Sequence, residues 1–200
     1  MQLITTKQAK LDKSRDYGFM TAGLTLSPAN ESGYINTCSH STAGCRVGCL
    51  KTSGRYVYDK SEKARIRRTE EFVFYRKRFL DQLNNELGNL ENRAKKAKLY
   101  PAFRLNVLSD LPWEAIAPKL FYDHIDIQFY DYTKNPRRMQ KFLNKELPPN
   151  YHLAFSLSEN YNNEAHAYSF ITQGVQVAVV YFDKLPRTQN GYRGTITTCG

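Results

Sequence analysis

The sequence lacks a long hydrophobic run. No segment of its 200 residues approaches the roughly 20 consecutive apolar residues that a membrane-spanning helix needs. The first twenty residues, MQLITTKQAKLDKSRDYGFM, also contain no apolar stretch long enough for a secretory signal peptide. We therefore expect a cytoplasmic protein with no membrane partner.

Two groups of catalytic signatures are also missing. The chain has no glycine-rich phosphate loop of the P-loop or dinucleotide-binding type. It has no serine or cysteine nucleophile motif either. Enzyme classes that depend on these motifs are therefore disfavoured, and any chemistry must come from other residues.

Cysteine is scarce, with four residues in total, but three of them lie within twelve positions. Cys38, Cys45 and Cys49 stand in the polar stretch NTCSHSTAGCRVGCLKTSGR, and Gly44 and Gly48 allow the backbone to fold tightly there. In a reducing compartment, clustered cysteines bind metal or carry out redox chemistry more often than they form disulfides. We interpret the cluster as a metal or iron–sulfur site, with a disulfide or inert thiols as the alternatives.

The cysteine spacing does not identify the metal. Six and then three intervening residues match neither the paired CxxC knuckles of zinc sites nor the CxxxCxxC motif of radical S-adenosylmethionine enzymes. Three thiolates from one loop suit a [4Fe–4S] cluster with one iron left free, whereas structural zinc needs four protein ligands. His40 and Cys199 are the available fourth ligands for zinc.

Composition indicates one folded domain over residues 1–200. The chain is 41% hydrophobic and 13% aromatic, and its length is sufficient for a substantial core. The formal net charge is +10 and the pI is about 9.4. This excess of basic residues favours nucleic acid, a nucleotide or an anionic cofactor as a partner, and a solvated basic face is the alternative.

Hydrophobic periodicity divides this domain into four parts. They are an N-terminal strand with the cysteine loop at 18–58, a long helical segment at 59–98, βα units at 101–183 and a C-terminal tail at 184–200. In the βα part, short apolar runs alternate with stretches long enough for crossover helices. We predict an α/β fold with a parallel sheet that forms a partial or complete (β/α) barrel, preceded by a long helix.

One face of the predicted strands is unusually polar. Parallel strands buried on both sides are nearly continuous in aliphatic residues, but here polar side chains alternate with apolar ones. One face therefore packs under helices, and the other is predicted to line a wet pocket. The substrate- or cofactor-binding candidates on this face are Arg104, Asn106, Gln128, His152 and Ser156.

Carboxylates follow the predicted strands at their C-terminal ends, which is the functional edge of parallel sheets. Asp110, Asp131 and Glu159 are the catalytic candidates, because carboxylates beside a basic residue such as Arg104 can orient a substrate or transfer protons. Neighbouring Ser and Asn residues at these ends are better explained as helix caps.

Seven segments between Gly18 and Phe182 carry a resemblance to a known family. In order, they are GFMTAGLTLSPANESGYINTC, GCRVGCLKTSGR, KARIRRTEEF, RLNVLSDLPWE, QFYDYTKNPRR, YHLAFSLSE and VAVVYF. They resemble a group of small bacteriophage proteins akin to the phage "gene product 88" family. The resemblance implies a viral protein of the host cytoplasm with an N-terminal cysteine cluster, at positions that match Cys38, Cys45 and Cys49. The closing segment GYRGTITTCG departs from it, so the resemblance favours three cysteine ligands without Cys199.

Two functions remain open from the sequence. The first is an enzyme similar to radical S-adenosylmethionine enzymes, in which a three-cysteine [4Fe–4S] cluster at the mouth of the polar pocket acts on nucleic acid or a nucleotide. The second is a non-enzymatic protein in which zinc or a cluster stabilises the loop and helix residues bind nucleic acid. Its phosphate-binding candidates are Arg65, Arg67, Arg68, Arg76, Lys77 and Arg78. Its base-stacking candidates are Tyr56, Tyr58 and Trp113.

Overall fold

The chain folds around a single β-sheet with helices packed against it. The computed structural model describes residues 1–5, 13–179 and 196–198. The strands follow one another across the sheet in chain order, and β1 is antiparallel to β2 whereas all later neighbours are parallel. Their bounds are β1 Ile4–Thr5, β2 Phe19–Leu24, β3 Tyr100–Arg104, β4 Gln128–Thr133, β5 Tyr151–Ser156, β6 Val177–Val179 and β7 Ile196–Thr198.

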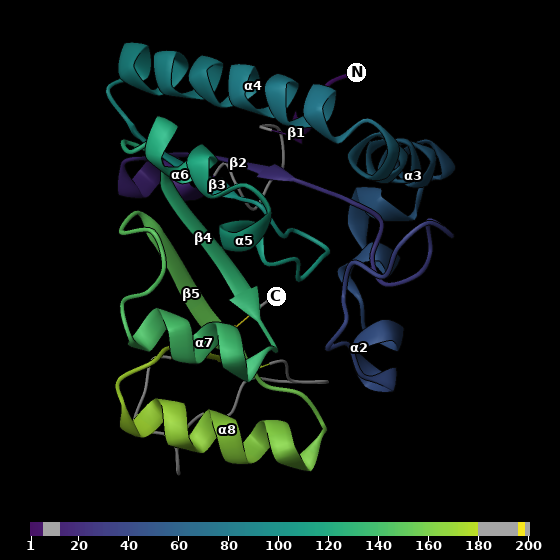
Figure 1. The fold of residues 1–200 in the computed structure, drawn as a ribbon, viewed down its shortest axis with the longest axis vertical. Coiled ribbons are helices and arrows are strands. Elements are labelled where there is room, and N and C mark those ends of the chain that lie inside the picture. Colours follow the sequence, from purple (N-terminus) through teal and green to yellow (C-terminus); the bar gives the residue numbers. More distant parts are fainter. Residues whose placement is uncertain (6–12, 180–195, 199–200) are drawn as a thin grey trace.

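Helices connect the parallel strands. Their bounds are η1 Lys13–Tyr17, α2 Ala43–Val47, η2 Leu50–Thr52, η3 Gly54–Val57, α3 Asp59–Phe74, α4 Arg76–Ala97, α5 Trp113–Ile116, α6 Pro118–Asp123, α7 Pro136–Leu143 and α8 Tyr161–Thr172. In Figure 1, α4 lies at the top of the view and α8 at the bottom. Helix α4 packs against β2 and β3, α7 against β4 and β5, and α8 against β5 and β6. Each connection between parallel strands leads to the next strand in the same direction across the sheet. Since such β–helix–β connections are right-handed, all these helices lie on one face of the sheet.

The hydrophobic core lies between this helix-covered face and the helices. Phe103, Phe129 and Phe155 point into it from three neighbouring strands, and each side chain is fully buried. The rings of Phe103 and Phe129 meet edge to face, with 6.1 Å between their centroids. Every second residue of each strand therefore points into the core, and the residues between them point to the opposite face of the sheet.

Two helices, α3 and α4, occupy the segment at 59–98 that the sequence predicts as helical. They separate at Tyr75, whose backbone has left the helical region at φ −128° and ψ 44°. Phe72 and Phe79 stand on either side of this break, and their buried rings lie 5.5 Å apart in an edge-to-face contact. The change of direction lets both helices bury an aromatic residue in one core.

The predicted parallel α/β sheet is confirmed, but a complete barrel is wrong. Among the described residues, β1 and β7 form the two edges and do not pair with each other, so the sheet is open. The strand predicted at 176–182 is seen as β6 up to Val179, and its remainder lies outside the described residues, as does most of the predicted tail. Within the described ranges, no helix combines the length and the apolar character that crossing a bilayer requires.

The C-terminus of α4 offers a stability test. Lys98 follows this helix in the left-handed conformation, at φ 55°, and the Leu99 N–H donates to the Ala94 carbonyl in the pattern of a helix-ending motif that favours glycine. Lys98→Gly should therefore raise the free energy of unfolding by about 0.5–1 kcal/mol, measured by urea denaturation.

Lys96→Gly is the matched control for this substitution, because Lys96 lies within the last turn of α4. It should lower the free energy of unfolding by about 1 kcal/mol. Equal destabilisation by both variants would contradict the left-handed assignment of Lys98.

Candidate functional site

The cysteine loop, residues 38–49, lies at the C-terminal edge of the parallel strands. It follows β2, and Figure 1 shows β2 and β4 pointing towards the side of the molecule where α2 lies. Cys45 is within α2, and Cys49 comes four residues later, directly before η2. All three cysteines are free thiols that are partly buried. The loop therefore occupies the edge at which parallel α/β sheets carry their ligands.

Cys38 is fixed against the connection that leaves β3. Its thiol donates a hydrogen bond to the carbonyl of Leu108 over 3.3 Å. The preceding residue, Thr37, is fully buried and accepts the backbone N–H of Asp110 at 2.8 Å. Two segments that are about seventy residues apart in the chain therefore hold the first cysteine in place.

The three thiols lie close enough to influence one another. Burial raises the pKa of Cys38, and the charges of Asp110 and Cys49 raise it further, whereas hydrogen bonds lower it. Burial likewise raises the pKa of Cys49, and the charge of Cys45 adds to this effect. Cys49 therefore interacts electrostatically with both other cysteines.

Two cations accompany these thiols. Arg65 and Lys134 both lower the pKa of Cys49, which opposes the effect of burial. The Arg65 side chain is buried, its Nη1 donates to the carbonyl of Tyr56 at 3.0 Å, and its Nε is buried without a hydrogen-bond partner in the described part of the chain. Lys134 donates from Nζ to the hydroxyl of Ser156 at 2.8 Å. This positive charge favours deprotonated sulfur at the loop.

The metal predicted at the cysteine loop stays a prediction. Within the described ranges, no three His, Cys, Asp or Glu side chains lie close enough together to hold one metal ion. A zinc ion needs each sulfur at about 2.3 Å from one centre, whereas a cluster binds each thiolate through a different iron. His40 is exposed, with its Nδ1 3.0 Å from the Ser39 hydroxyl. Cys199 lies outside the described residues.

Glu159 connects α2 to the end of β5. Its carboxylate accepts the Thr42 hydroxyl at 2.7 Å and the Gly44 N–H at 2.8 Å. Thr42 is the N-cap of α2, and its hydroxyl oxygen accepts the N–H of Cys45 at 3.1 Å. The hydrogen bond from Thr42, followed by backbone hydrogen bonds, lowers the pKa of Glu159. The predicted proton-transfer role for Glu159 stays a prediction, and what the structure shows is an ionised anchor of the cysteine loop.

Asn106 and Asp131 were predicted at the wet pocket and at its edge, but both are buried on the helix-covered side. Asp131 lies two residues after Phe129 on β4 and therefore on the same face, and it accepts the Asn106 N–H at 2.7 Å, the Asn106 amide at 3.0 Å and the Tyr151 hydroxyl at 2.7 Å. Asn106 follows the end of β3, where the strand alternation no longer applies. Burial raises the pKa of Asp131 to about 6, although Arg104 and these hydrogen bonds lower it.

Arg138 extends this network to Asp110. Its guanidinium is buried, donates to Glu114 through two nitrogens at 2.8 and 2.9 Å, and donates to Asp110 at 2.6 Å. The other oxygen of Asp110 accepts the Thr133 hydroxyl and the Lys134 N–H. Asp110 therefore organises the ends of two strands, and its predicted catalytic role stays a prediction. Arg138 was missed from the sequence because a single arginine in an amphipathic helix gives no sign of burial.

The remaining predicted ligand-binding residues lie on β3, β4 and β5. Arg104 and Ser156 lie at the C-terminal ends of β3 and β5 and are partly buried. Gln128 begins β4, where its amide donates to two backbone carbonyls, and His152 lies near the start of β5. Gln128 is thus on the predicted face but at the end of the strands away from the cysteine loop, whereas the His152 ring lies 5.2 Å from the ring of Phe142 on α7 in an edge-to-face contact.

The residues proposed from the sequence to bind nucleic acid are largely engaged within the protein. Arg68 donates to the carbonyl of Gln2 at 3.1 Å, Lys77 pairs with Asp81, and Arg78 forms a two-oxygen ion pair with Glu71. Trp113 is completely buried, and its indole N–H donates to Asn106. The prediction that Trp113 stacks on bases is therefore wrong.

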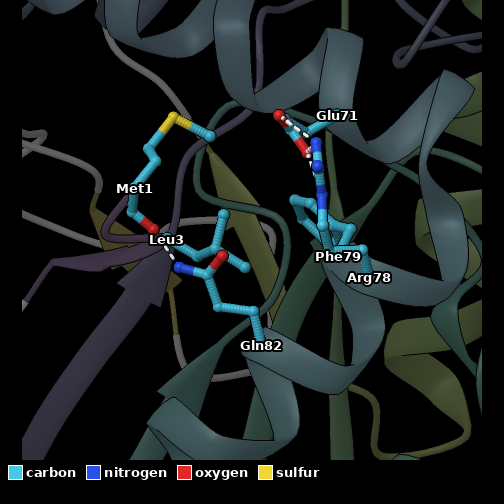
Figure 2. Close-up of a pocket in the computed structure, with 6 residues that line it drawn as sticks. All are labelled: Met1, Leu3, Glu71, Arg78, Phe79 and Gln82. Carbon is cyan, nitrogen blue, oxygen red and sulfur yellow. Dashed lines mark hydrogen bonds and ion pairs between the residues drawn. The ribbon is translucent and has the colours of Figure 1, made fainter.

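A cavity of about 300 Å³ lies elsewhere, where the N-terminus meets α3 and α4. Figure 2 shows its lining, in which Glu71 pairs with Arg78 and the Gln82 amide donates to the carbonyl of Met1. The other lining residues are Leu3 and Phe79. These polar groups satisfy one another, and none of them is among the candidates predicted at the cysteine loop or the strand ends.

Comparison with protein families matches residues 2–199 to the family described as Gene product 88. The chain belongs to this family of phage gene products. The match confirms the resemblance that the sequence segments carried, and it extends beyond them at both ends. No curated protein and no solved structure matches this Gene product 88 protein. Its chemistry must therefore be inferred from the site itself.

The buried Asp131 predicts a pH dependence of stability. Because its folded pKa, about 6, exceeds the ordinary value of 3.8, the folded protein binds more protons than the unfolded chain between these two values. The free energy of unfolding of the wild type, relative to Asp131→Asn, should fall by about 2.5 kcal/mol as the pH rises from about 4 to about 7. Urea denaturation across this range measures it, and a flat or rising difference would contradict the assignment.

The contact between Gly44 and Glu159 predicts a selective effect on the cysteine loop. A Cβ atom on Gly44 would lie 2.8 Å from Oε1 of Glu159, whereas one on Gly48 would meet its nearest neighbour at an ordinary 3.4 Å. Gly44→Ala should therefore break the anchor and speed hydrogen exchange of the loop amides by about tenfold or more, the equivalent of a lost charge-assisted hydrogen bond. Gly48→Ala, the matched control, should leave exchange near the wild-type rate, and similar exchange in both variants would contradict the anchor.

Proposed function

We propose that this protein is an enzyme similar to radical S-adenosylmethionine enzymes, with a three-cysteine [4Fe–4S] cluster at the C-terminal edge of the sheet and nucleic acid or a nucleotide as substrate. The observation that carries the proposal is the gathering of Cys38, Cys45 and Cys49 with Arg65 and Lys134 at this edge. Three thiols and two cations in one place suit an anionic cofactor.

The sheet supports this proposal as an incomplete barrel. Consecutive strands from β2 to β6 are neighbours, all are parallel, and the helices lie on one side, which is the arrangement of βα units in a barrel. In a (β/α) barrel, the face opposite the helices is the inner face. Arg104 and Ser156 would then point into the space beside the cysteine loop.

The loop has suitable donors for a cluster. Cys38, Cys45 and Cys49 are the only cysteines within the described residues, and they would supply three thiolates and leave one iron free of protein ligands. When bound, such a cluster would supply an electron to a cofactor at that iron. Cys45 lies in α2, and Cys49 follows the Gly48 C-cap of that helix, so a single short turn would supply two of the three thiolates.

The neighbouring residues would support the cluster and position the substrate. Arg65, whose buried Nε lacks a partner in the described part of the chain, would balance the charge of the thiolates. Glu159 would keep α2 in place through Thr42 and Gly44. Arg104 would contribute a cation on the substrate side. The chain thus divides the tasks of holding the cofactor and binding the substrate between the loop and the strand ends.

Metal and sulfide analysis of protein purified without oxygen tests the proposal. The wild type should contain about four irons and four sulfides per chain, with the broad visible absorption of a cluster. Cys45→Ala should lose most of both, because two cysteines cannot retain the cluster, and Cys199→Ala should retain them. These variants separate loop ligands from a cysteine outside the described residues.

The result also determines the next experiment. A cluster that is present in the wild type and absent in Cys45→Ala justifies an assay for reductive cleavage of S-adenosylmethionine. One zinc per chain, or no metal, would overturn the enzyme proposal. A zinc ion would direct attention to the alternative from the sequence, a metal-stabilised protein that binds nucleic acid without catalysis.

A further inference from the structure

Three side chains, two from β4 and one from the residue that follows it, point in one direction on the face opposite the helices. Tyr130 and Tyr132 are partly buried there, on the side away from Phe129 and Asp131. Lys134 follows two residues later, and its Nζ contacts the hydroxyl of Ser156, which lies on the same face of β5. The two tyrosines and the lysine therefore form a line that ends at the cysteine edge.

Arg104 joins this line from β3. Its guanidinium carbon lies 4.7 Å from the centre of the Tyr132 ring, so the side chain reaches along the sheet towards the cysteine edge. Lys134 is two residues beyond Tyr132, a distance of about 7 Å along an extended chain. The two cations are thus within the reach of one small ligand.

Neither cation is fully neutralised within the described ranges. Arg104 donates from Nε to the Asn106 carbonyl at 3.1 Å, and the nearest oxygen of Asp131 lies 4.0 Å away. That carboxylate already accepts three shorter hydrogen bonds from Asn106 and Tyr151. The Nη1 and Nη2 atoms of Arg104 have no hydrogen bond to a described residue, and the Lys134 ammonium contacts only the neutral Ser156 hydroxyl at hydrogen-bond distance.

We propose that Arg104, Lys134 and Ser156 bind the phosphate monoester of a nucleotide. A phosphate monoester carries close to two negative charges near neutral pH, which matches two cations, and its oxygens can accept hydrogen bonds from all three side chains. Tyr130 and Tyr132 lie beside this position and can contact the sugar or base. The proposal rests on the proposed function, because it names the substrate class of the same site.

The position of this subsite also suits the site geometry. Lys134 acts electrostatically on Cys49, and it acts on Glu159, the anchor of the cysteine loop. A phosphate held by Lys134 would therefore lie within electrostatic range of Cys49. The rest of a nucleotide would extend over the tyrosines of β4, away from the helix-covered core.

Calorimetric titration tests the subsite with the four ribonucleoside 5′-monophosphates, the matching nucleosides and inorganic phosphate. The nucleotides should bind at least tenfold more tightly than the nucleosides and than inorganic phosphate. Lys134→Met and Arg104→Gln should each weaken nucleotide binding by about tenfold or more, because each removes one charge-assisted contact. Lys119→Met is the control, since Lys119 is exposed on α6 and pairs with Asp123, and it should leave the affinity unchanged.

Repeating the titration with Cys45→Ala separates the two proposals. Nucleotide binding that persists in this variant supports the subsite even where no iron is found in the wild type. Nucleosides that bind as well as nucleotides, inorganic phosphate that binds as tightly as nucleotides, or undiminished binding in both Lys134→Met and Arg104→Gln would overturn the subsite. Circular dichroism of each variant confirms that a weakened affinity does not come from unfolding.

Discussion

The buried carboxylate of Asp131 determines how the strand ends are arranged. A charge in the core is costly unless hydrogen bonds replace its lost hydration. Asp131 meets this requirement by accepting hydrogen bonds from Asn106 after β3 and from Tyr151 on β5, so it ties three neighbouring strands together. Tyr151 also contacts Arg138, which holds Asp110. The position of the first cysteine depends on this network, because Asp110 donates to the residue before Cys38.

A second and independent contact controls the other half of the cysteine loop. Glu159 follows β5, and its carboxylate receives the hydroxyl of the α2 N-cap and the N–H of Gly44. This contact is at the surface, where hydrogen bonds open more easily than in the core. Cys38 is therefore held by buried groups, whereas Cys45 depends on an exposed anchor.

The two faces of the sheet have different chemical roles. One face buries phenylalanines under the helices and supplies stability. The other carries Arg104, Tyr132 and Ser156, where the Arg104 guanidinium lies 4.0 Å from the nearest oxygen of Asp131 and the Lys134 ammonium contacts the neutral Ser156 hydroxyl. Alternation along extended strands makes this division possible, because neighbouring residues point to opposite sides. The same alternation brings Lys134 to the cysteine edge, where the proposed cluster and the proposed phosphate would meet.

Local patterns in the sequence are enough to predict the parallel α/β sheet, the helical segment before β3 and the polar face with Arg104 and Ser156, because periodicity records which side chains face a core. Three features become evident only in the folded chain: the burial of Asn106 and Asp131, the separation of the helices at Tyr75, and the open sheet. These features depend on contacts between residues far apart in the chain, such as Glu159 with Gly44, and local patterns carry no record of such contacts. A buried hydrogen-bonded carboxylate and an exposed catalytic one look alike in sequence, since burial is a property of the whole fold.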